Sequence, residues 1–156
     1  MTIRDKLAGD VVLGDGGTLF ELERRGYVSA GPFTPEVVIE HPECLRQLQV
    51  DFARAGSQVL QSLTYYAHRD KLQGIGREDA LEEINTTAVK IAREVADAYN
   101  ILVAGNICNT WIYEPGDPST FTRTREQFDE QIGFQADQGP DFFIAETIEY
   151  LGEAKI

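Results

Sequence analysis

Ile101-Leu102-Val103-Ala104-Gly105-Asn106 is the stretch that decides the fold, because a helix-length amphipathic segment stands directly before it. In that preceding segment, residues 78–99, apolar side chains recur at spacings of three and four, which predicts a helix with one buried face. These side chains are Leu81, Ile84, Ala88, Ile91, Val95 and Tyr99. The apolar run itself is continuous, which is typical of a strand that is covered on both faces of a parallel sheet.

The same alternation extends in both directions along the chain. We expect three further strands, at 11–13, 59–66 and 141–146. Thr34-Pro35-Glu36 has the signature of a helix start, and that helix should end near Gly56 with a possible break at His41-Pro42. Another helix is expected from about 124 to 138, and a last one begins at Glu149. The pattern predicts an α/β fold in which strand and helix repeat and the fourth helix is cut short.

Two arrangements of these units fit the pattern. One is an open doubly wound sheet, and the other is a closed barrel. No G-x-G-x-x-G fingerprint opens the first helix, which weakens a dinucleotide-binding interpretation. Four strand–helix units cannot close an eight-stranded barrel, so a barrel interpretation makes this chain half of one.

Composition excludes several classes of function. The net charge of −12 disfavours nucleic acid as a partner, because acidic chains repel phosphate backbones. No apolar run approaches the roughly 20 residues of a membrane span, and no signal core follows the N-terminus, so we expect a cytoplasmic protein without membrane contact. Cys44 and Cys108 are the only two cysteines and form no metal-binding pair.

Candidate site residues are the polar groups at the carboxyl ends of the expected strands, where parallel α/β folds carry their chemistry. Asp15 and Glu146 are the acids among them, joined by Ser62 and the amide Asn106. Asp15 could simply bond backbone amides in a glycine turn. Glu146 follows four apolar residues, where a carboxylate is costly unless it is paired or used. Two carboxylates from different strands could bind an ammonium group.

Aromatic residues gather near the same strand ends. Tyr65 and Tyr66 are adjacent, so in a strand they would face opposite sides and at most one would point into the mouth. Packing is the alternative role for both. Phe33, Trp111 and Tyr113 on loops could join a cage for a quaternary ammonium group through cation–π attraction. Cys108 is interpreted as a small buried residue.

Ten stretches of the chain, in order, resemble the betaine–homocysteine S-methyltransferases. They are Leu13–Gly17, Leu22–Val28, Ala30–Glu36, Glu40–Glu43, Arg46–Leu48, Arg54–Ser57, Ser62–Ala67, Asp70–Leu72, Val103–Asn106 and Ile144–Glu146. The combination is far more specific than any single motif. The resemblance implies that residues 1–156 are the first four βα units of a TIM (β/α)8 barrel domain, truncated within the fourth helix.

The resemblance also implies a zinc-dependent transfer of a methyl group from glycine betaine to homocysteine, which gives methionine. By carry-over, homocysteine would be held by Asp15, Gly16, Ser62 and Glu146. The methyl donor would lie among Phe33, Tyr65 and Tyr66. The chain departs from the family at Phe33 (Trp is usual), Ser62 (Thr) and Thr147 (Tyr). A related methylated onium donor is therefore an alternative to betaine.

The family's zinc cysteines come from later barrel strands. We therefore expect that this chain is a fragment, binds no zinc and is inactive alone. Two alternatives remain. One is a homocysteine methyltransferase that uses S-methylmethionine or methylfolate, although the stretch 30–36 argues against it. The other is a non-catalytic half-barrel, whose open strand edges would favour self-association. We expect a homo-oligomer.

Overall fold

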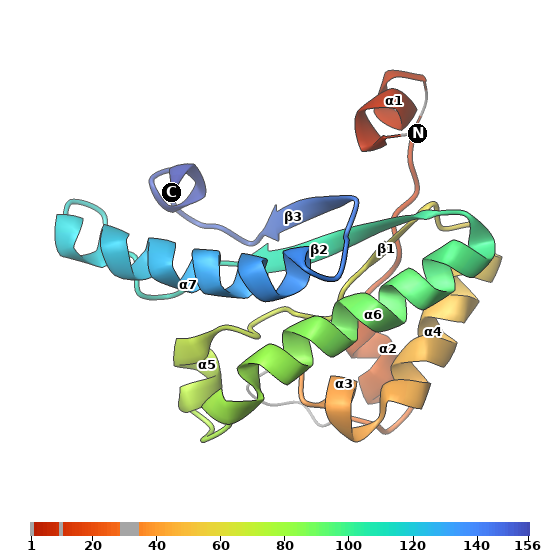
Figure 1. Cartoon of the computed structure of the whole chain (residues 1–156), viewed down its shortest axis with the longest axis horizontal. Helices are drawn as coiled ribbons and strands as arrows, with labels where there is room; N and C mark the ends of the chain where they lie inside the picture. Colours follow the sequence, from red (N-terminus) through yellow and green to blue (C-terminus); the bar gives the residue numbers. More distant parts are fainter. Residues whose placement is uncertain (1, 10, 29–34) are drawn as a thin grey trace.

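The computed structural model describes residues 2–9, 11–28 and 35–156. Its centre is a parallel sheet of three strands in the order β1-β2-β3 (Figure 1). The strands are β1 (Val59–Gln61), β2 (Leu102–Cys108) and β3 (Phe142–Glu146). In the register, Val59 faces Leu102 and Ala104 faces Phe142, so the carboxyl ends of all three strands lie at one edge. The fold is therefore α/β with a parallel sheet, as the alternation of apolar runs and amphipathic segments predicts.

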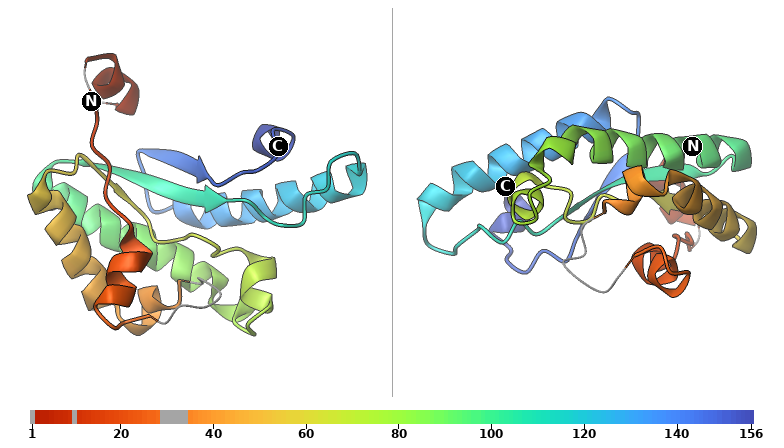
Figure 2. Two further views of the ribbon diagram at one scale, coloured as in Figure 1. Left: turned by 180° about the vertical axis from the view of Figure 1, so that it is seen from behind. Right: turned by 90° about the horizontal axis from the view of Figure 1, so that it is seen from below.

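Seven α-helices and two 3-10 turns accompany the sheet in the described residues. They are α1 (Ile3–Gly9), α2 (Thr18–Arg24), α3 (Val37–Glu40), α4 (Pro42–Ala55), α5 (Arg69–Gln73), η1 (Glu78–Ala80), α6 (Leu81–Tyr99), α7 (Pro118–Ala136) and η2 (Glu153–Lys155). The long helix α6 packs against both α4 and α7, and the three form one layer under the sheet. Helix α1 lies on the other side (Figure 2). Within the described ranges, no helix is long and apolar enough to cross a membrane.

The prediction of a first strand at 11–13 is wrong. Residues 11–17 form no ladder, although they run beside β1. A backbone bond joins the two segments, from the Gln58 amide to the Leu13 carbonyl at 2.8 Å. The Leu13 amide instead donates to the side chain of Gln58, and the Gly14 carbonyl accepts from the hydroxyl of Ser57. Side chains thus replace the backbone bonds that a strand needs, and the count of four βα units is not confirmed.

Two other boundaries differ from expectation. The strand expected over 59–66 ends at Gln61, because the chain turns there and Tyr66 adopts a left-handed backbone with φ of 58°. The helix expected from Glu149 is only the 3-10 turn η2. The break at His41-Pro42 is confirmed, since α3 ends at Glu40 and α4 begins at Pro42. The proposed cap Thr34 lies outside the described residues.

The two faces of the sheet have different roles. Leu60 and Val103 point towards α6 and pack with its Val89, Ala92 and Val95 in a fully apolar layer. On the opposite face, Val59, Leu102 and Ala104 form a second buried cluster, which Ile3, Val12, Phe142 and Ile144 partly cover. Further along this second face the side chains become polar, at Gln61, Asn106 and Glu146. The second face is therefore apolar where the strands begin and polar where they end.

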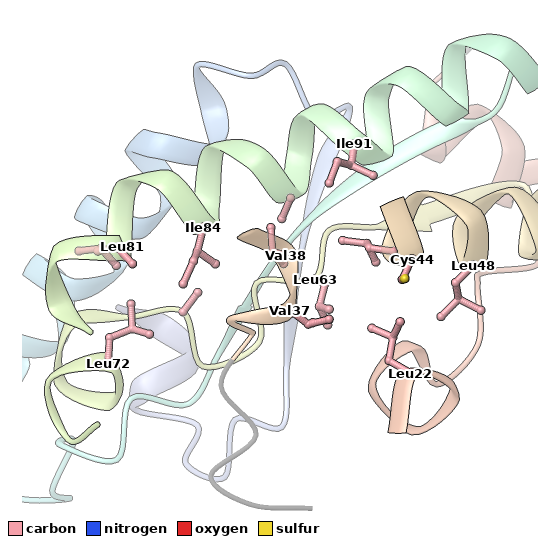
Figure 3. Close-up of a cluster of buried hydrophobic side chains, with 14 residues drawn as sticks. Leu22, Val37, Val38, Cys44, Leu48, Leu63, Leu72, Leu81, Ile84 and Ile91 are labelled. Atoms are coloured by element: carbon pink, nitrogen blue, oxygen red, sulfur yellow. The ribbon is translucent and has the colours of Figure 1, made fainter. Parts of the chain in front are cut away.

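The largest apolar cluster lies among α2, α3, α4 and α6 (Figure 3). Leu22 and Leu48 meet there, and Leu81, Ile84 and Ile91 enter from α6. Leu63 and Ala67, from the segment that follows β1, are buried in the same cluster. The core therefore anchors both ends of the short segment that carries Tyr65 and Tyr66.

Candidate functional site

A pocket of about 580 Å³ opens where β1 and β3 end. Its wall combines the segment before and at the start of α2, the end of β1 with the segment after it, one residue of α5, one residue of the loop after β2, and the end of β3. The lining residues are Asp15, Gly16, Gly17, Thr18, Leu19, Phe20, Gln61, Ser62, Leu63, Tyr65, Tyr66, Lys71, Trp111, Glu146 and Thr147. Six of the seven residues to which the resemblance assigns a substrate are therefore together, and Phe33 lies outside the described residues.

Two carboxylates share one end of this pocket, and Gln61 joins them. The backbone amide of Gln61 donates to Asp15 Oδ2 at 2.8 Å. The side-chain amide of the same residue donates to Glu146 Oε1 at 3.0 Å. Asn106 Nδ2 donates to that same Glu146 oxygen at 2.6 Å, while its buried Oδ1 has no hydrogen-bond partner among the described residues. The acids from two separate segments are thus held in fixed relation, as a site for an ammonium group requires.

Burial raises the pKa of Asp15 from its ordinary value of 3.8 to about 6, and the charge of Glu146 adds to the effect. The hydrogen bond from the Gln61 amide acts in the opposite direction but is weaker. Desolvation favours the neutral form of a carboxyl group, and a like charge nearby does the same. A cation between the two acids would offset both the desolvation of Asp15 and its repulsion by Glu146. The charges of the pocket therefore favour the binding of a cation.

Ser62 borders the pocket, but its hydroxyl is committed to a buried network. It lies 3.0 Å from the Thr64 hydroxyl and 3.3 Å from Gln135 Oε1, and it accepts from the Asn106 amide at 3.0 Å. Gln135 also donates to the Asn106 carbonyl and to Asn85, so that α7 is tied to β2 and α6. Ser62 and Gln135 therefore hold the ends of β1 and β2 in place beneath the acids.

The aromatic end of the pocket corrects one expectation. Tyr65 and Tyr66 were expected on opposite sides of a strand, yet their ring centroids lie 4.2 Å apart and both line the pocket. The strand has already ended at Gln61, so the alternation of side chains no longer applies. Trp111 meets Tyr66 edge to face at 5.6 Å. Tyr113 does not take part, because it stacks on Phe121 instead.

Left-handed backbone conformations are concentrated at this end. Three of the four non-glycine residues with positive φ in the described chain border the pocket: Tyr66 (58°), Trp111 (63°) and Thr147 (54°). For bulky or β-branched side chains this conformation costs on the order of 1–3 kcal/mol each. Such strain persists only where the surrounding structure enforces it, and it gathers at functional sites. The fourth residue, Asn100, simply ends α6.

Sequence reasoning missed Gln61 and Lys71. The side chain of Gln61 looks like that of any strand residue, and only its position at the strand end could have singled it out. Lys71 lies on the short helix α5, and its ammonium is 4.5 Å from the ring centroids of both Tyr66 and Trp111. No spacing rule links these three residues, since Trp111 comes from the loop after β2.

Comparison with known proteins decides the family. Residues 12–156 match the family model described as homocysteine S-methyltransferase. The chain belongs to the homocysteine S-methyltransferase family. It is 45% identical over 151 residues to betaine–homocysteine S-methyltransferase 1 of Rattus norvegicus, which covers 94% of this chain and 37% of the relative. It is also 45% identical, over 147 residues, to the S-methylmethionine–homocysteine S-methyltransferase of the same species, with 94% and 39% covered.

A solved structure supports the fold of this family member. The metallated form of the homocysteine methyltransferase MmuM from Escherichia coli superposes with a TM-score of 0.81 at 24% identity, covering 97% of this chain and 59% of that one. The chain thus spans little more than a third of the length of the two rat enzymes, and each match covers 94% of this chain.

Zinc, which the resemblance implies for homocysteine S-methyltransferases, does not fit the residues described here. Among these residues no group of three or more histidine, cysteine, aspartate or glutamate side chains could hold a metal ion. Cys44 is buried on α4 and Cys108 is buried at the end of β2. Burial raises the pKa of Cys108 to about 12, which disfavours the thiolate that metals bind.

Proposed function

We propose that this chain forms the substrate-binding part of a methyltransferase that moves a methyl group from a methylated onium donor to homocysteine. The observation that carries the proposal is the pair Asp15 and Glu146, joined by Gln61 in one pocket with Tyr65 and Tyr66. The acids would bind the ammonium group of homocysteine, and the rings would face the positively charged donor. Gly16 and Ser62 would complete the homocysteine side.

Methyl transfer is a displacement at carbon. The sulfur of the homocysteine thiolate forms a bond to the methyl carbon while the bond from that carbon to the positively charged nitrogen or sulfur breaks. The onium group leaves as a neutral amine or thioether, and methionine forms. Such a step gains most from holding the two reactants in line. The acidic end of the pocket would hold homocysteine, and the aromatic end would hold the donor.

The identity of the donor is part of the proposal. Relatives named for betaine and for S-methylmethionine are equally similar to this chain. Phe33, the third expected donor residue, lies outside the described residues. A panel of glycine betaine, S-methylmethionine and methylfolate, each supplied with homocysteine, would distinguish the donors by mass spectrometry of methionine. We expect the onium donors to be used by a longer form of the protein and not by this chain alone.

Homocysteine binding tests the proposal directly. We expect L-homocysteine to bind this chain in calorimetric titration, and Asp15→Asn or Glu146→Gln to weaken binding roughly 10- to 100-fold, since each removes one charge-assisted bond. Glu149→Gln is the matched control, because this acid is exposed and lies outside the pocket. Equal binding by the wild type and both pocket variants would refute the proposed role of the acids.

A further inference from the structure

The aromatic end of the pocket already contains a cation. Lys71 Nζ lies 4.5 Å from the centroid of the Tyr66 ring and 4.5 Å from that of Trp111. The two rings meet edge to face, with centroids 5.6 Å apart and planes at 80°. They form two walls of a corner, and the ammonium sits within cation–π distance of both. Lys71, Tyr66 and Trp111, here called the aromatic corner, all line the pocket.

The corner is built by the fold. Tyr66 is buried, and its main-chain amide donates to the sulfur of Cys108 at 3.3 Å. Both corner residues with rings have left-handed backbones, which fixes the direction in which each ring projects. Lys71 is positioned by its neighbour Leu72, which is fully buried in the main apolar cluster. Within residues 2–9, 11–28 and 35–156, no carboxylate makes a salt bridge with Lys71.

We propose that the Lys71 ammonium is an internal occupant of the aromatic corner, and that a methylated cation binds there only by displacing it. Two positive charges cannot share the corner, because their repulsion in a partly desolvated site outweighs the attraction of the second cation to the rings. A displaced lysine side chain loses little, since its flexible stem can carry the strongly hydrated ammonium to water. A quaternary ammonium or sulfonium group is weakly hydrated and gains more from the rings.

Lys71 thereby determines which cations can bind at the aromatic corner. Ammonium groups that resemble lysine compete poorly with a tethered copy of themselves, whereas methylated onium groups can replace it. Trp111 supports this role, because 69% of it is exposed and the corner opens to solvent on that side. The inference rests on the proposed function only in taking the corner as the place of the donor's onium group; the occupancy of the corner can be tested without homocysteine or turnover.

Trp111 is the only tryptophan in the chain, so its fluorescence reports on the corner directly. We would titrate tetramethylammonium, which lacks a carboxylate, into the wild type, Lys71→Gln and Lys71→Arg. We expect Lys71→Gln to bind about tenfold more tightly than the wild type, because the competitor is gone, and Lys71→Arg to bind no more tightly than the wild type. Lys90→Gln, an exposed lysine of α6, is the matched control and should leave binding unchanged.

The main alternative is that Lys71 binds the carboxylate of the donor, and titrations with glycine betaine distinguish this alternative from the proposal. If Lys71→Gln lost affinity for betaine and left that for tetramethylammonium unchanged, Lys71 would be a ligand of the donor carboxylate and the proposal would be wrong. Equal or weaker binding of tetramethylammonium by Lys71→Gln would also overturn it. Failure of homocysteine binding, by contrast, would refute the proposed function and leave this result untouched.

The unmodified chain offers a second measurement that does not depend on a variant folding. Ring currents of Tyr66 and Trp111 should shift the ε-methylene protons of Lys71 upfield in the NMR spectrum of the free chain. Saturating tetramethylammonium should move these signals back to the positions of a solvated lysine. Signals that stay in place while the Trp111 fluorescence responds would show that both cations bind together, contrary to the proposal.

Discussion

Asp15 and His68 make the stability of this chain depend on pH in opposite directions. The folded-state pKa of Asp15, about 6, lies above its ordinary value of 3.8. Between these values the native chain keeps a proton that the unfolded chain has released. The Asp15 carboxyl group therefore favours the native state fully only below pH 3.8, and this contribution is lost as the pH rises through 6.

Replacing Asp15 by asparagine should remove this decrease in the free energy of unfolding at higher pH. We expect Asp15→Asn to increase the free energy of unfolding at pH 7.5 by about 1–3 kcal/mol, because a partly buried charge is replaced by a neutral amide of the same shape. The gain should be absent at pH 4. Calorimetric unfolding at both pH values checks the sign. A variant that is less stable than the wild type at pH 7.5 would show that the carboxylate is well paired in the free protein.

His68 should act in the reverse sense. Its side chain is buried at the start of α5, and burial lowers its pKa below 6.5. As the pH falls below 6.5, the unfolded chain binds a proton that the native chain does not bind. The free energy of unfolding therefore decreases with falling pH. His68→Phe, which keeps an aromatic ring, should reduce the decrease in the free energy of unfolding between pH 7 and pH 5.

At the scale of residues, the sequence indicates the two acids of the site but not the residues that connect them. Asp15 and Glu146 stand out because each ends an apolar run, where a carboxylate is unexpected. Gln61 and Gln135 carry no such signal, although one joins the acids and the other joins three elements. Their importance comes from contacts between residues far apart in the chain. The left-handed backbones of Trp111 and Thr147 are equally invisible, since neither residue type favours that conformation.

At the scale of elements, Gly105 in β2 illustrates how a helix is brought close to a strand. A Cβ atom at this position would lie 2.6 Å from the Phe143 ring and 2.9 Å from Gln135 Oε1. The missing side chain lets α7 place Gln135 against the backbone of β2, where its Oε1 accepts from the Asn106 amide. The close approach of α7 thereby supports the strand end that carries Asn106.

Two glycine substitutions should therefore have opposite effects. Gly105→Ala should lower the free energy of unfolding by about 1–3 kcal/mol, because the ring and the amide must both move in a packed region. Gly133→Ala, on the exposed face of α7 with no atom within 4 Å of the added Cβ, should raise it by about 0.5–1 kcal/mol. Urea unfolding of both variants provides the comparison. Equal stability of the two would mean that α7 does not need this close approach.

Elements with a strong periodic pattern could be predicted, and those that depend on pairing could not. The helix over 78–99 is found as η1 and α6, and its buried face contains all the expected residues except Tyr99, which is exposed. The segment 11–13 has the composition of a strand but pairs through the side chains of Ser57 and Gln58. Helix α7 begins at Pro118, earlier than expected, because Asp117 caps it by accepting from the Ser119 amide.

At the scale of the whole molecule, the sheet has two edges in the described chain, at β1 and β3. The segment beside β1 presents apolar side chains to solvent, including Leu13, which is 58% exposed. Exposed apolar groups next to an incompletely paired strand favour association with a second copy. The homo-oligomer therefore remains a prediction, and we expect its interface at the segment beside β1.

Light scattering over a range of micromolar concentrations tests this prediction. We expect the wild type to have at least twice the monomer mass and Leu13→Lys to shift the distribution towards the monomer. Leu151→Lys is the matched control, since Leu151 is also exposed but lies on the C-terminal segment far from β1 in the sequence. A monomeric wild type would contradict the prediction, as would equal dissociation by both variants.

The division of one sheet face into an apolar beginning and a polar end has a practical consequence for protein engineering. Val59, Leu102 and Ala104 form the buried apolar part of this face, while the groups that line the pocket lie at the strand ends and beyond them. Ligand preference could therefore be altered by randomising Tyr65, Lys71, Trp111 and Thr147 in a library, while the cohesive layer is left intact. Such a library should retain a high proportion of folded members, because the positions that are varied and the positions that secure folding do not overlap.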